Sequence, residues 1–243
     1  MTSNRFFITQ ANFNTSYVWL EGEEHHHLSR VSRIKPKEKV WLLDKRGISY
    51  LARVEEINKD RTKLLILEKK DQEVLKLKIT LAQALIKSKK MELIIQKSAE
   101  LGLTHFIPMI TSRSVVKIEG KIEKKLQRWQ KIAYEAAKQC GSSWVLRIQP
   151  LHHLKTLVTQ KKEKKNILLS ENQGEYLKEI LLQEKNPPSS ILILVGPEGG
   201  WAEEEEEYIL NNGFEAVSLG RNILRTETAA ISSLALISHF WNL

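Results

Sequence analysis

A glycine-rich turn near residue 200 has the composition of a ligand site. Residues 191–195 are uniformly apolar, residues 196–200 read GPEGG, and residues 203–207 are consecutive glutamates. Glycines let a ligand approach the backbone, and α/β proteins bind ligands outside the carboxyl ends of strands. The turn lacks the spacing of a P-loop or a dinucleotide loop, and the glutamates would repel phosphate. We therefore expect no nucleotide site; a tight turn before an acid-capped helix is the alternative to a ligand site.

A second candidate segment, residues 219–230, reads LGRNILRTETAA. An irregular loop leads into a helix rich in small residues, and the hydroxyl of Thr226 or Thr228 can cap that helix. Arg221 and Arg225 lie in the loop, close to small residues that permit tight packing. This arrangement is typical of a site; an ordinary helix start with solvated arginines is the alternative.

Positive charge is concentrated in the middle of the chain. The net charge is +9 and the sequence pI is ≈ 9.5. Residues 73–150 carry 15 Lys and Arg against 6 Asp and Glu, whereas residues 151–243 carry 9 against 13. A basic region suits a polyanionic partner such as a nucleic acid. Solvated faces of ordinary helices are the alternative.

Composition excludes several classes of protein. Hydrophobic residues make up 42% and charged residues 28%, which is neither a disordered nor a membrane composition. No apolar run approaches the roughly 18 residues of a membrane span, and the first residues lack the order of a secretory signal. The single cysteine, Cys140, gives no internal disulfide and no Cys-based metal site. We expect a soluble, cytoplasmic protein with no membrane partner.

These segments require two kinds of structure to position them. Residues 1–72 read as a β-rich unit with a hairpin turn at 44–47 and one helix at 23–34. From residue 73 to 243, strands alternate with helices, which predicts a mostly parallel sheet covered on both faces. The predicted strands are 6–8, 40–43, 50–57, 62–68, 79–85, 105–109, 167–169, 191–195 and 216–219. The predicted later helices are 89–101, 121–140, 173–182, 203–210 and 226–241.

The two candidate segments together resemble the C-terminal signature of the SPOUT methyltransferases. They read LVGPEGGWAEEEE with GFEAVSLG, and ILRTETAAISSLAL. More narrowly, the chain is similar to the RsmE family, which methylates nitrogen 3 of a uridine in small-subunit (16S) ribosomal RNA. Further blocks follow in the family's order: RFFI, HHHLSRVSRIK, ALIKSKKMELIIQKSAELG, IPMITSRSVVK and RWQKIAYEAAKQCG. The chain departs from the family at Ala202, where a Ser or Thr commonly caps the helix.

The resemblance implies a fold and partners. Residues 1–72 would form a PUA-like β-barrel that helps to hold RNA. Residues 73–243 would form a SPOUT α/β domain whose chain threads a deep trefoil knot. The family binds S-adenosylmethionine in the knot and acts as a homodimer, with the RNA contacted by both subunits.

Three loops are expected to hold the cofactor. S-adenosylmethionine carries no phosphate, so an acidic helix start is tolerable beside it. Its adenine needs an apolar slot and backbone hydrogen bonds. The resemblance implies cofactor contacts from Leu169, Ser170, Glu171, Val195, Gly196, Pro197, Glu198, Gly199, Gly200, Leu219, Gly220, Ile223, Leu224, Arg225 and Thr226.

Catalysis requires the imino proton of the uridine to leave. A cation near the neighbouring carbonyl oxygens stabilises the deprotonated base. Arg225 is the first candidate for this role and Arg221 the second. Glu198 or Glu227 is a candidate proton acceptor, although either can instead orient the loops.

The RNA is expected to meet cations from both units. The candidate phosphate contacts are Arg5, Arg30, Arg33, Lys87, Lys89, Lys90, Arg113 and Lys117. The run His25-His26-His27 is not expected to bind a metal, because consecutive helical side chains point about 100° apart. A structural or RNA-facing role is expected instead.

Two other functions remain compatible with the sequence. One is a SPOUT methyltransferase that acts on ribose or on another RNA. The other is a non-catalytic RNA-binding or ribosome-assembly factor, against which the intact GPEGG and LRTETAA segments argue.

Overall fold

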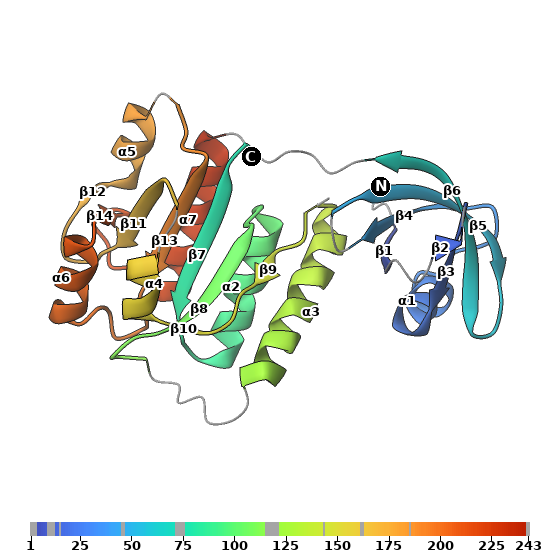
Figure 1. The fold of residues 1–243 in the computed structure, drawn as a ribbon, viewed down its shortest axis with the longest axis horizontal. Coiled ribbons are helices and arrows are strands. Elements are labelled where there is room, and N and C mark those ends of the chain that lie inside the picture. The colour runs from blue at the N-terminus through green and yellow to red at the C-terminus, as the bar shows by residue number, and fades with distance from the viewer. Residues whose placement is uncertain are drawn as a thin grey trace. The chain divides into compact units, whose positions relative to one another are not determined.

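The chain forms two compact units, each described here by itself (Figure 1). The computed structural model describes residues 4–8, 13–14, 16–44, 47–70, 76–114, 122–142, 144–160, 163–184 and 186–241. One unit comprises residues 1–74 and 137–145, and the other comprises residues 75–136 and 146–243. The domain boundary expected between residues 72 and 73 stays a prediction. In the structure, residues 137–145 group with the first unit.

A six-stranded curled sheet builds the first unit, in the order β1-β4-β5-β6-β3-β2. β1 and β4 pair in parallel, and the other pairs are antiparallel. The strands are β1 (Arg5–Ile8), β2 (Phe13–Asn14), β3 (Tyr17–Glu21), β4 (Lys39–Asp44), β5 (Ser49–Ile57) and β6 (Arg61–Lys70). Four of them confirm the predicted strands, whereas β2 and β3 were not predicted. Residues 45 and 46 of the expected hairpin turn lie outside the described residues.

Buried residues alternate with more exposed ones along these strands, and the buried ones form the core of the first unit. In β3, Val18 and Leu20 are buried with Phe6 and Leu64, whereas Tyr17 and Trp19 are half-buried. The helix predicted over 23–34 is shorter than expected. It consists of α1 (Gly22–His26) and a π-helical turn, η2 (His27–Val31). Arg33 has φ +52°, a left-handed conformation in which a helix cannot continue.

An eight-stranded sheet builds the second unit, and all its pairings are parallel. The order is β10-β8-β7-β13-β11-β14-β12, with β9 beside β8. The strands are β7 (Lys78–Ala84), β8 (His105–Ile110), β9 (Arg147–Ile148), β10 (His152–His153), β11 (Lys165–Leu169), β12 (Glu175–Tyr176), β13 (Ser190–Val195) and β14 (Glu215–Ser218).

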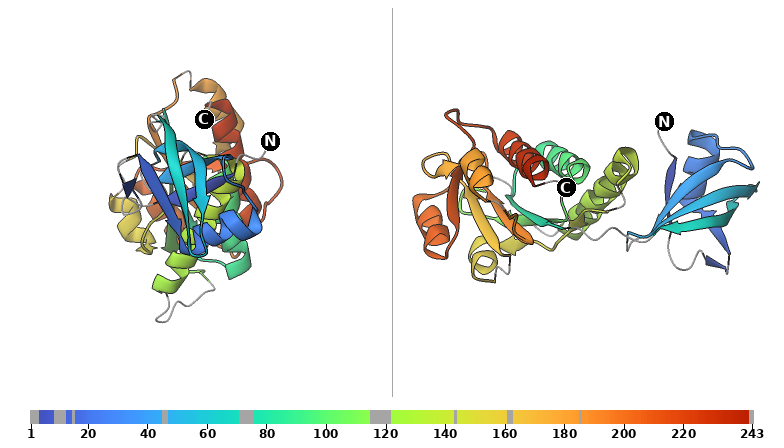
Figure 2. Two further views of the ribbon diagram at one scale, coloured as in Figure 1. Left: turned by 90° about the vertical axis from the view of Figure 1, so that its right-hand side faces the viewer. Right: turned by 90° about the horizontal axis from the view of Figure 1, so that it is seen from above.

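Helices cover both faces of this sheet, as predicted, and Figure 2 shows α7 and α2 on the face opposite α6 and α4. The helices are α2 (Ser88–Glu100), α3 (Ile122–Cys140), α4 (Leu154–Gln160), α5 (Leu177–Gln183), α6 (Glu203–Asn211) and α7 (Thr226–Phe240). Apolar residues of α2, α3, α5 and α7 form one core with the sheet. Residues of α4 and α6 form a second core on the other face. No helix in the described part of the chain is long and apolar enough to cross a membrane.

The helix predicted over 173–182 is wrong at its start. The chain instead forms β12 and then α5, which begins at Leu177. Gly174 has φ +112°, and a Cβ at this position would lie 2.4 Å from the backbone of Ala216 in β14. A helix cannot begin through a residue in that conformation. The short elements β9, β10 and α4 were not predicted.

Candidate active site

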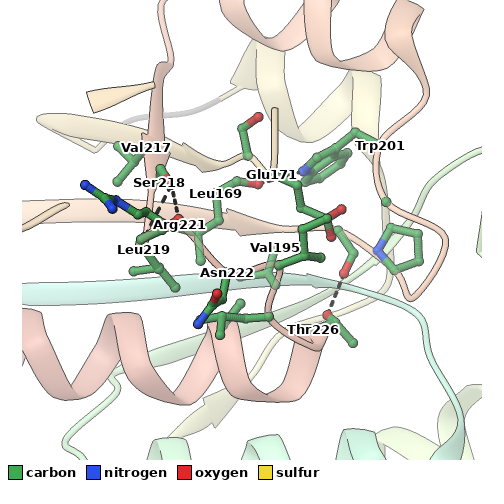
Figure 3. Close-up of a pocket in the computed structure, with 18 residues that line it drawn as sticks. Leu169, Glu171, Val195, Trp201, Val217, Ser218, Leu219, Arg221, Asn222 and Thr226 are labelled. Atoms are coloured by element: carbon green, nitrogen blue, oxygen red, sulfur yellow. Dashed lines mark hydrogen bonds between the residues drawn. The ribbon is translucent and has the colours of Figure 1, made fainter. Parts of the chain in front are cut away.

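A pocket opens at the carboxyl edge of the parallel sheet, where β11, β13 and β14 lie side by side (Figure 3). Its walls come from the loops that follow these three strands. It encloses about 600 Å³ of space, a figure that includes its open, solvent-filled mouth. The lining residues are Leu169, Ser170, Glu171, Val195, Gly196, Pro197, Gly200, Trp201, Val217, Ser218, Leu219, Gly220, Arg221, Asn222, Ile223, Leu224, Thr226 and Ala229.

Trp201 closes one side of the pocket and was not predicted as a site residue. Its ring is 8% exposed, and its Nε1 donates a hydrogen bond to the Leu169 carbonyl at 2.9 Å. A Cβ at residue 196 would lie 3.1 Å from this ring, so Gly196 lets the turn pass close to the indole. The indole thereby ties the end of β11 to the glycine-rich turn that follows β13.

Gln83 anchors the glycine-rich turn to the start of α7 and was also missed. It is fully buried in β7, and its Nε2 donates to the Gly196 carbonyl at 3.1 Å and to Thr226 Oγ1 at 3.0 Å. The Thr226 hydroxyl donates to the same carbonyl at 2.6 Å, the bond dashed at Thr226 in Figure 3. An amide between the alanines that end this strand was the available signal, since buried polar groups need partners.

One of the five glutamates expected at the helix start is part of the protein interior. Glu206 is 6% exposed and accepts a short hydrogen bond from the Ser170 hydroxyl. The same hydroxyl oxygen accepts from the backbone N–H groups of Asn172 and Gln173, at 3.1 Å and 3.2 Å. The pair therefore fixes the loop after β11, which forms one wall of the pocket.

A second cavity adjoins the pocket and contains more charge. It is lined by Lys90, Glu171, Pro197, Glu198, Ile223, Leu224, Arg225 and Thr226. Lys90 Nζ lies 3.1 Å from a carboxylate oxygen of Glu227 and 3.5 Å from one of Glu198. Burial pushes the pKa of Glu227 upward, but hydrogen bonds from its own backbone N–H and from Lys90, with the charges of Lys90 and Arg225, lower it overall. Glu227 is therefore ionised at neutral pH.

Most of the residues expected to hold the cofactor line the pocket. The three that do not are Glu198, Gly199 and Arg225. Glu198 and Arg225 line the second cavity instead. Gly199 accepts a hydrogen bond on its carbonyl from Arg113 Nη1 at 3.0 Å. Arg221, the second catalytic candidate, lines the first pocket.

The expected RNA contacts differ in their surroundings. Lys87 and Lys89 are exposed where α2 begins, and Arg30 and Arg33 are exposed in the first unit. Three others already have partners in the protein, namely Lys90, Arg113 and Arg5, whose Nη1 donates to the Ser142 carbonyl at 3.2 Å. Lys117 lies outside the described residues.

The histidine run is built into the first unit. His25 is buried, with Nδ1 2.8 Å from Thr62 Oγ1 and Nε2 3.2 Å from the Lys59 carbonyl. The His27 ring lies edge-on to Phe6, and His26 is exposed. Within the described ranges, no group of three or more His, Cys, Asp or Glu could hold a metal ion.

Fold and pocket together define the class of protein. Residues 73–238 match the RNA methyltransferase domain family, and residues 20–67 match the RNA methyltransferase PUA domain family. An α/β unit with a loop-built pocket is thus joined to a unit with a curled sheet of the PUA type, as the resemblance implied.

Curated relatives and solved structures identify the family more narrowly. A ribosomal RNA small subunit methyltransferase E of Bacillus subtilis is 35% identical over 90% of this chain and 89% of its own length. That of Aquifex aeolicus is 32% identical over 96% and 99%. The crystal structure of the Neisseria gonorrhoeae protein of the same name, bound to S-adenosyl methionine, superposes with a TM-score of 0.87 at 33% identity, over 98% of both chains. The chain belongs to the ribosomal RNA small subunit methyltransferase E family.

Proposed function

We propose that this chain transfers a methyl group from S-adenosylmethionine to nitrogen 3 of a uridine in small-subunit (16S) ribosomal RNA. The pocket at the carboxyl edge of the parallel sheet carries this proposal, because three loops meet there around one concave site lined by apolar residues and glycines. The relatives support it, since they are named small-subunit methyltransferases and one was crystallised with S-adenosyl methionine.

The residues of the pocket fit this cofactor. Gly196 and Gly200 have no side chain where they line the pocket, and a Cβ at residue 196 would press on the Trp201 ring. Leu169, Val195 and Leu219 supply an apolar wall of the kind an adenine needs. The acidic first turn of α6 disfavours a phosphate-bearing ligand but not S-adenosylmethionine.

When bound, S-adenosylmethionine supplies an electrophilic methyl group on a sulfonium. The protein has to orient the base and stabilise the charge that forms when the N3 proton leaves. The electron pair left on N3 forms the new N–C bond while the S–CH₃ bond breaks, giving 3-methyluridine and S-adenosylhomocysteine. Arg225 stabilises the anionic base, and Glu198 or Glu227 accepts the proton.

The target nucleotide has to leave its stack to reach the bound cofactor. Extruding a base costs a few kcal/mol, and contacts to the phosphate backbone offset that cost. Lys87 and Lys89, exposed at the start of α2, provide such contacts, and Arg30 and Arg33 add cations from the first unit. The RNA affinity should therefore fall steeply as the salt concentration rises.

The family resemblance also implies an oligomeric state, a location in the cell and a knotted backbone. The chain acts as a homodimer in the cytoplasm, and the loops of the cofactor pocket belong to a trefoil knot. Two subunits related by a two-fold axis present two cofactor pockets to the RNA. Size-exclusion chromatography with light scattering measures the oligomeric state.

The test uses purified protein, labelled S-adenosylmethionine and small ribosomal subunits from a strain that lacks this gene. Nucleoside mass spectrometry identifies the methylated product. We expect 3-methyluridine in the 16S rRNA. A ribose-methylated product, or transfer only to another RNA, contradicts the uridine-N3 assignment. If calorimetry detects no binding of S-adenosylmethionine, the chain is a non-catalytic RNA-binding factor.

A further inference from the structure

The second cavity contains more charged groups than the proposed function uses. Two cations, Lys90 and Arg225, and two carboxylates, Glu171 and Glu198, line its wall. Five of its lining residues also line the cofactor pocket, including Pro197. A group that lies in this cavity is therefore next to the bound cofactor.

Lys90 joins two different parts of the chain at this cavity. Its ammonium lies between Glu198 of the glycine-rich turn and Glu227 in the first turn of α7. Glu227 is the more buried carboxylate, with a side chain 14% exposed against 26% for Glu198, and only Glu198 lines the cavity. Glu227 therefore holds the Lys90 ammonium in place without lining the cavity itself. With two carboxylate partners, Lys90 is poorly placed to neutralise a phosphate.

The charged groups that line the second cavity match the hydrogen-bonding edge of uracil better than that of cytosine. Uracil presents a carbonyl oxygen, an N–H and a second carbonyl oxygen along its pairing edge, which enzymes read on an extruded base. Ammonium and guanidinium groups only donate hydrogen bonds, and an ionised carboxylate only accepts them. Cytosine presents an unprotonated ring nitrogen and an amino group instead, so the nitrogen would face carboxylate lone pairs and the amino group a cation.

We propose that the second cavity receives the target base and selects uracil. Glu198 accepts the hydrogen bond from N3–H, and Lys90 and Arg225 donate to the two carbonyl oxygens. Glu227 is a positioning residue that acts through Lys90. This inference rests on the proposed function and adds to it the residues that choose the base. It separates the roles of the two candidate proton acceptors, because only Glu198 lines the cavity.

The test compares two substrates that differ in one base. Once mass spectrometry has located the 3-methyluridine, 16S rRNA with cytidine at that position is assembled into small subunits beside the uridine form. The variants are Glu198→Gln, Lys90→Met, Lys90→Arg and Glu227→Gln. Two matched controls are Glu203→Gln, an exposed glutamate of α6, and Lys97→Met, which removes the ion pair of Lys97 with Glu100 on the same helix as Lys90.

We expect the wild-type protein to prefer uridine by about 10⁴-fold in kcat/KM, as sites that hydrogen-bond their substrate do. Glu198→Gln should reduce that preference at least about 100-fold, since a neutral amide no longer repels the unprotonated nitrogen of cytosine as a carboxylate does. Lys90→Met and Glu227→Gln should lower kcat about 10- to 100-fold with the KM for S-adenosylmethionine unchanged. Lys90→Arg should recover most of the loss, and the two controls should match the wild type.

A second readout does not depend on turnover. Protein loaded with S-adenosylhomocysteine should bind the uridine form more tightly than the cytidine form, and Glu198→Gln should narrow this difference. If Glu198→Gln keeps the wild-type preference for the uridine form, the cavity does not read the base. If Lys90→Met weakens the binding of the uridine and cytidine forms equally, Lys90 is a phosphate contact and does not contact the base. If the proposed function itself is wrong, the wild-type protein forms no 3-methyluridine. That result is distinct from one in which 3-methyluridine forms but the variants do not change the choice of base.

Discussion

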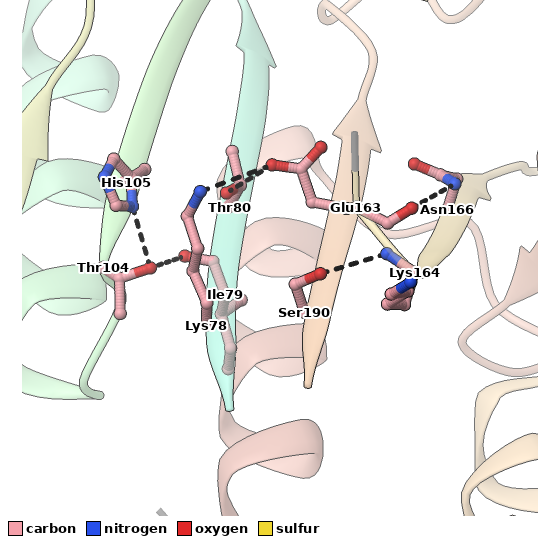
Figure 4. Close-up of polar contacts among 9 residues, drawn as sticks. All are labelled: Lys78, Ile79, Thr80, Thr104, His105, Glu163, Lys164, Asn166 and Ser190. Atoms are coloured by element: carbon pink, nitrogen blue, oxygen red, sulfur yellow. Dashed lines mark hydrogen bonds and ion pairs between the residues drawn. The ribbon is translucent and has the colours of Figure 1, made fainter. Parts of the chain in front are cut away.

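The two edges of the parallel sheet use their polar residues in opposite ways. At the amino edge, polar groups pair with one another (Figure 4). The Thr80 hydroxyl donates to Glu163 at 3.4 Å, Lys78 Nζ lies 3.7 Å from the same carboxylate, and His105 Nδ1 is 3.1 Å from Thr104 Oγ1. At the carboxyl edge, glycine-rich loops surround a pocket, and charged side chains line the cavity beside it.

This difference shows what makes one edge of a sheet a site. Polar groups that are already paired with one another stabilise the fold and offer little to a ligand. The carboxyl edge stays open because Gly196 and Gly200 carry no side chains and because Trp201 and Gln83 hold the turn from behind. Substitutions at the carboxyl edge should therefore change binding and turnover, and those at the amino edge should change stability alone.

The largest effect is expected from Arg225→Ala. Removing a cation that stabilises developing charge should lower kcat about 100- to 1,000-fold. The side chain is exposed, so the circular dichroism spectrum and the oligomeric state should match the wild type. Methyl transfer to small subunits is the measurement. Near-normal turnover would show that Arg225 does not act on the base.

Gln83→Leu should weaken cofactor binding about tenfold, a loss of about 1.4 kcal/mol, because the glycine-rich turn and the start of α7 lose their shared anchor. The control is Gln130→Leu on α3. Gln130 Nε2 donates to the Leu146 carbonyl at 2.9 Å, and its Oε1 accepts from the Ile148 N–H at 3.0 Å, near the amino edge. Calorimetry should find the control's affinity unchanged. If both variants lost the same cofactor affinity, the carboxyl edge would not differ from the amino edge in its effect on binding.

Gly196→Ala should lower the cofactor affinity by several-fold with little change in stability. The added methyl group would lie 3.1 Å from the Trp201 ring, so the ring or the turn has to move by a few tenths of an ångström. Gly102→Ala is the contrasting variant. Its Cβ would meet nothing within 4 Å, but φ is +84°, so it should lower the melting temperature without affecting binding. Unchanged cofactor affinity in Gly196→Ala would argue against a close approach there.

His105→Asn should have the smallest effect and act on the pH dependence of stability alone. Burial, then the charges of Lys78 and Arg147, lower the pKa of His105 from 6.5 to about 4, although Glu163 opposes this. The unfolded chain therefore binds the proton first, so stability is lost as the pH falls from 6.5 towards about 4.

Thermal unfolding measured across that pH range should give a flatter profile for His105→Asn than for the wild type. Methyl transfer at neutral pH should stay within about twofold of the wild type, since His105 lies at the edge of the sheet opposite the pocket. A large loss of turnover would mean that the amino edge contributes to the site.

The longer elements could be predicted because they carry periodic apolar patterns. The strands around 79–85 and 191–195 and the helices around 89–101 and 226–241 lie within a few residues of the observed β7, β13, α2 and α7. The start of the helix predicted over 173–182 was wrong because Gly174 is fixed by a contact with the backbone of β14, far away in the sequence. The two-residue strands were missed because they exist only through their pairing partners.

The sequence alone determined where ligand chemistry concentrates in this protein. A glycine-rich turn after an apolar strand and an arginine-bearing loop before a helix of small residues are local features, and both segments line the pocket. Only the tertiary structure decided which side chains from elsewhere in the chain contact these segments and hold them in place. Gln83 reaches Gly196 and Thr226, Lys90 reaches Glu198 and Glu227, and Ser170 reaches Glu206. Such contacts join residues tens to more than a hundred positions apart, so they depend on strand order and helix packing, which no local pattern encodes.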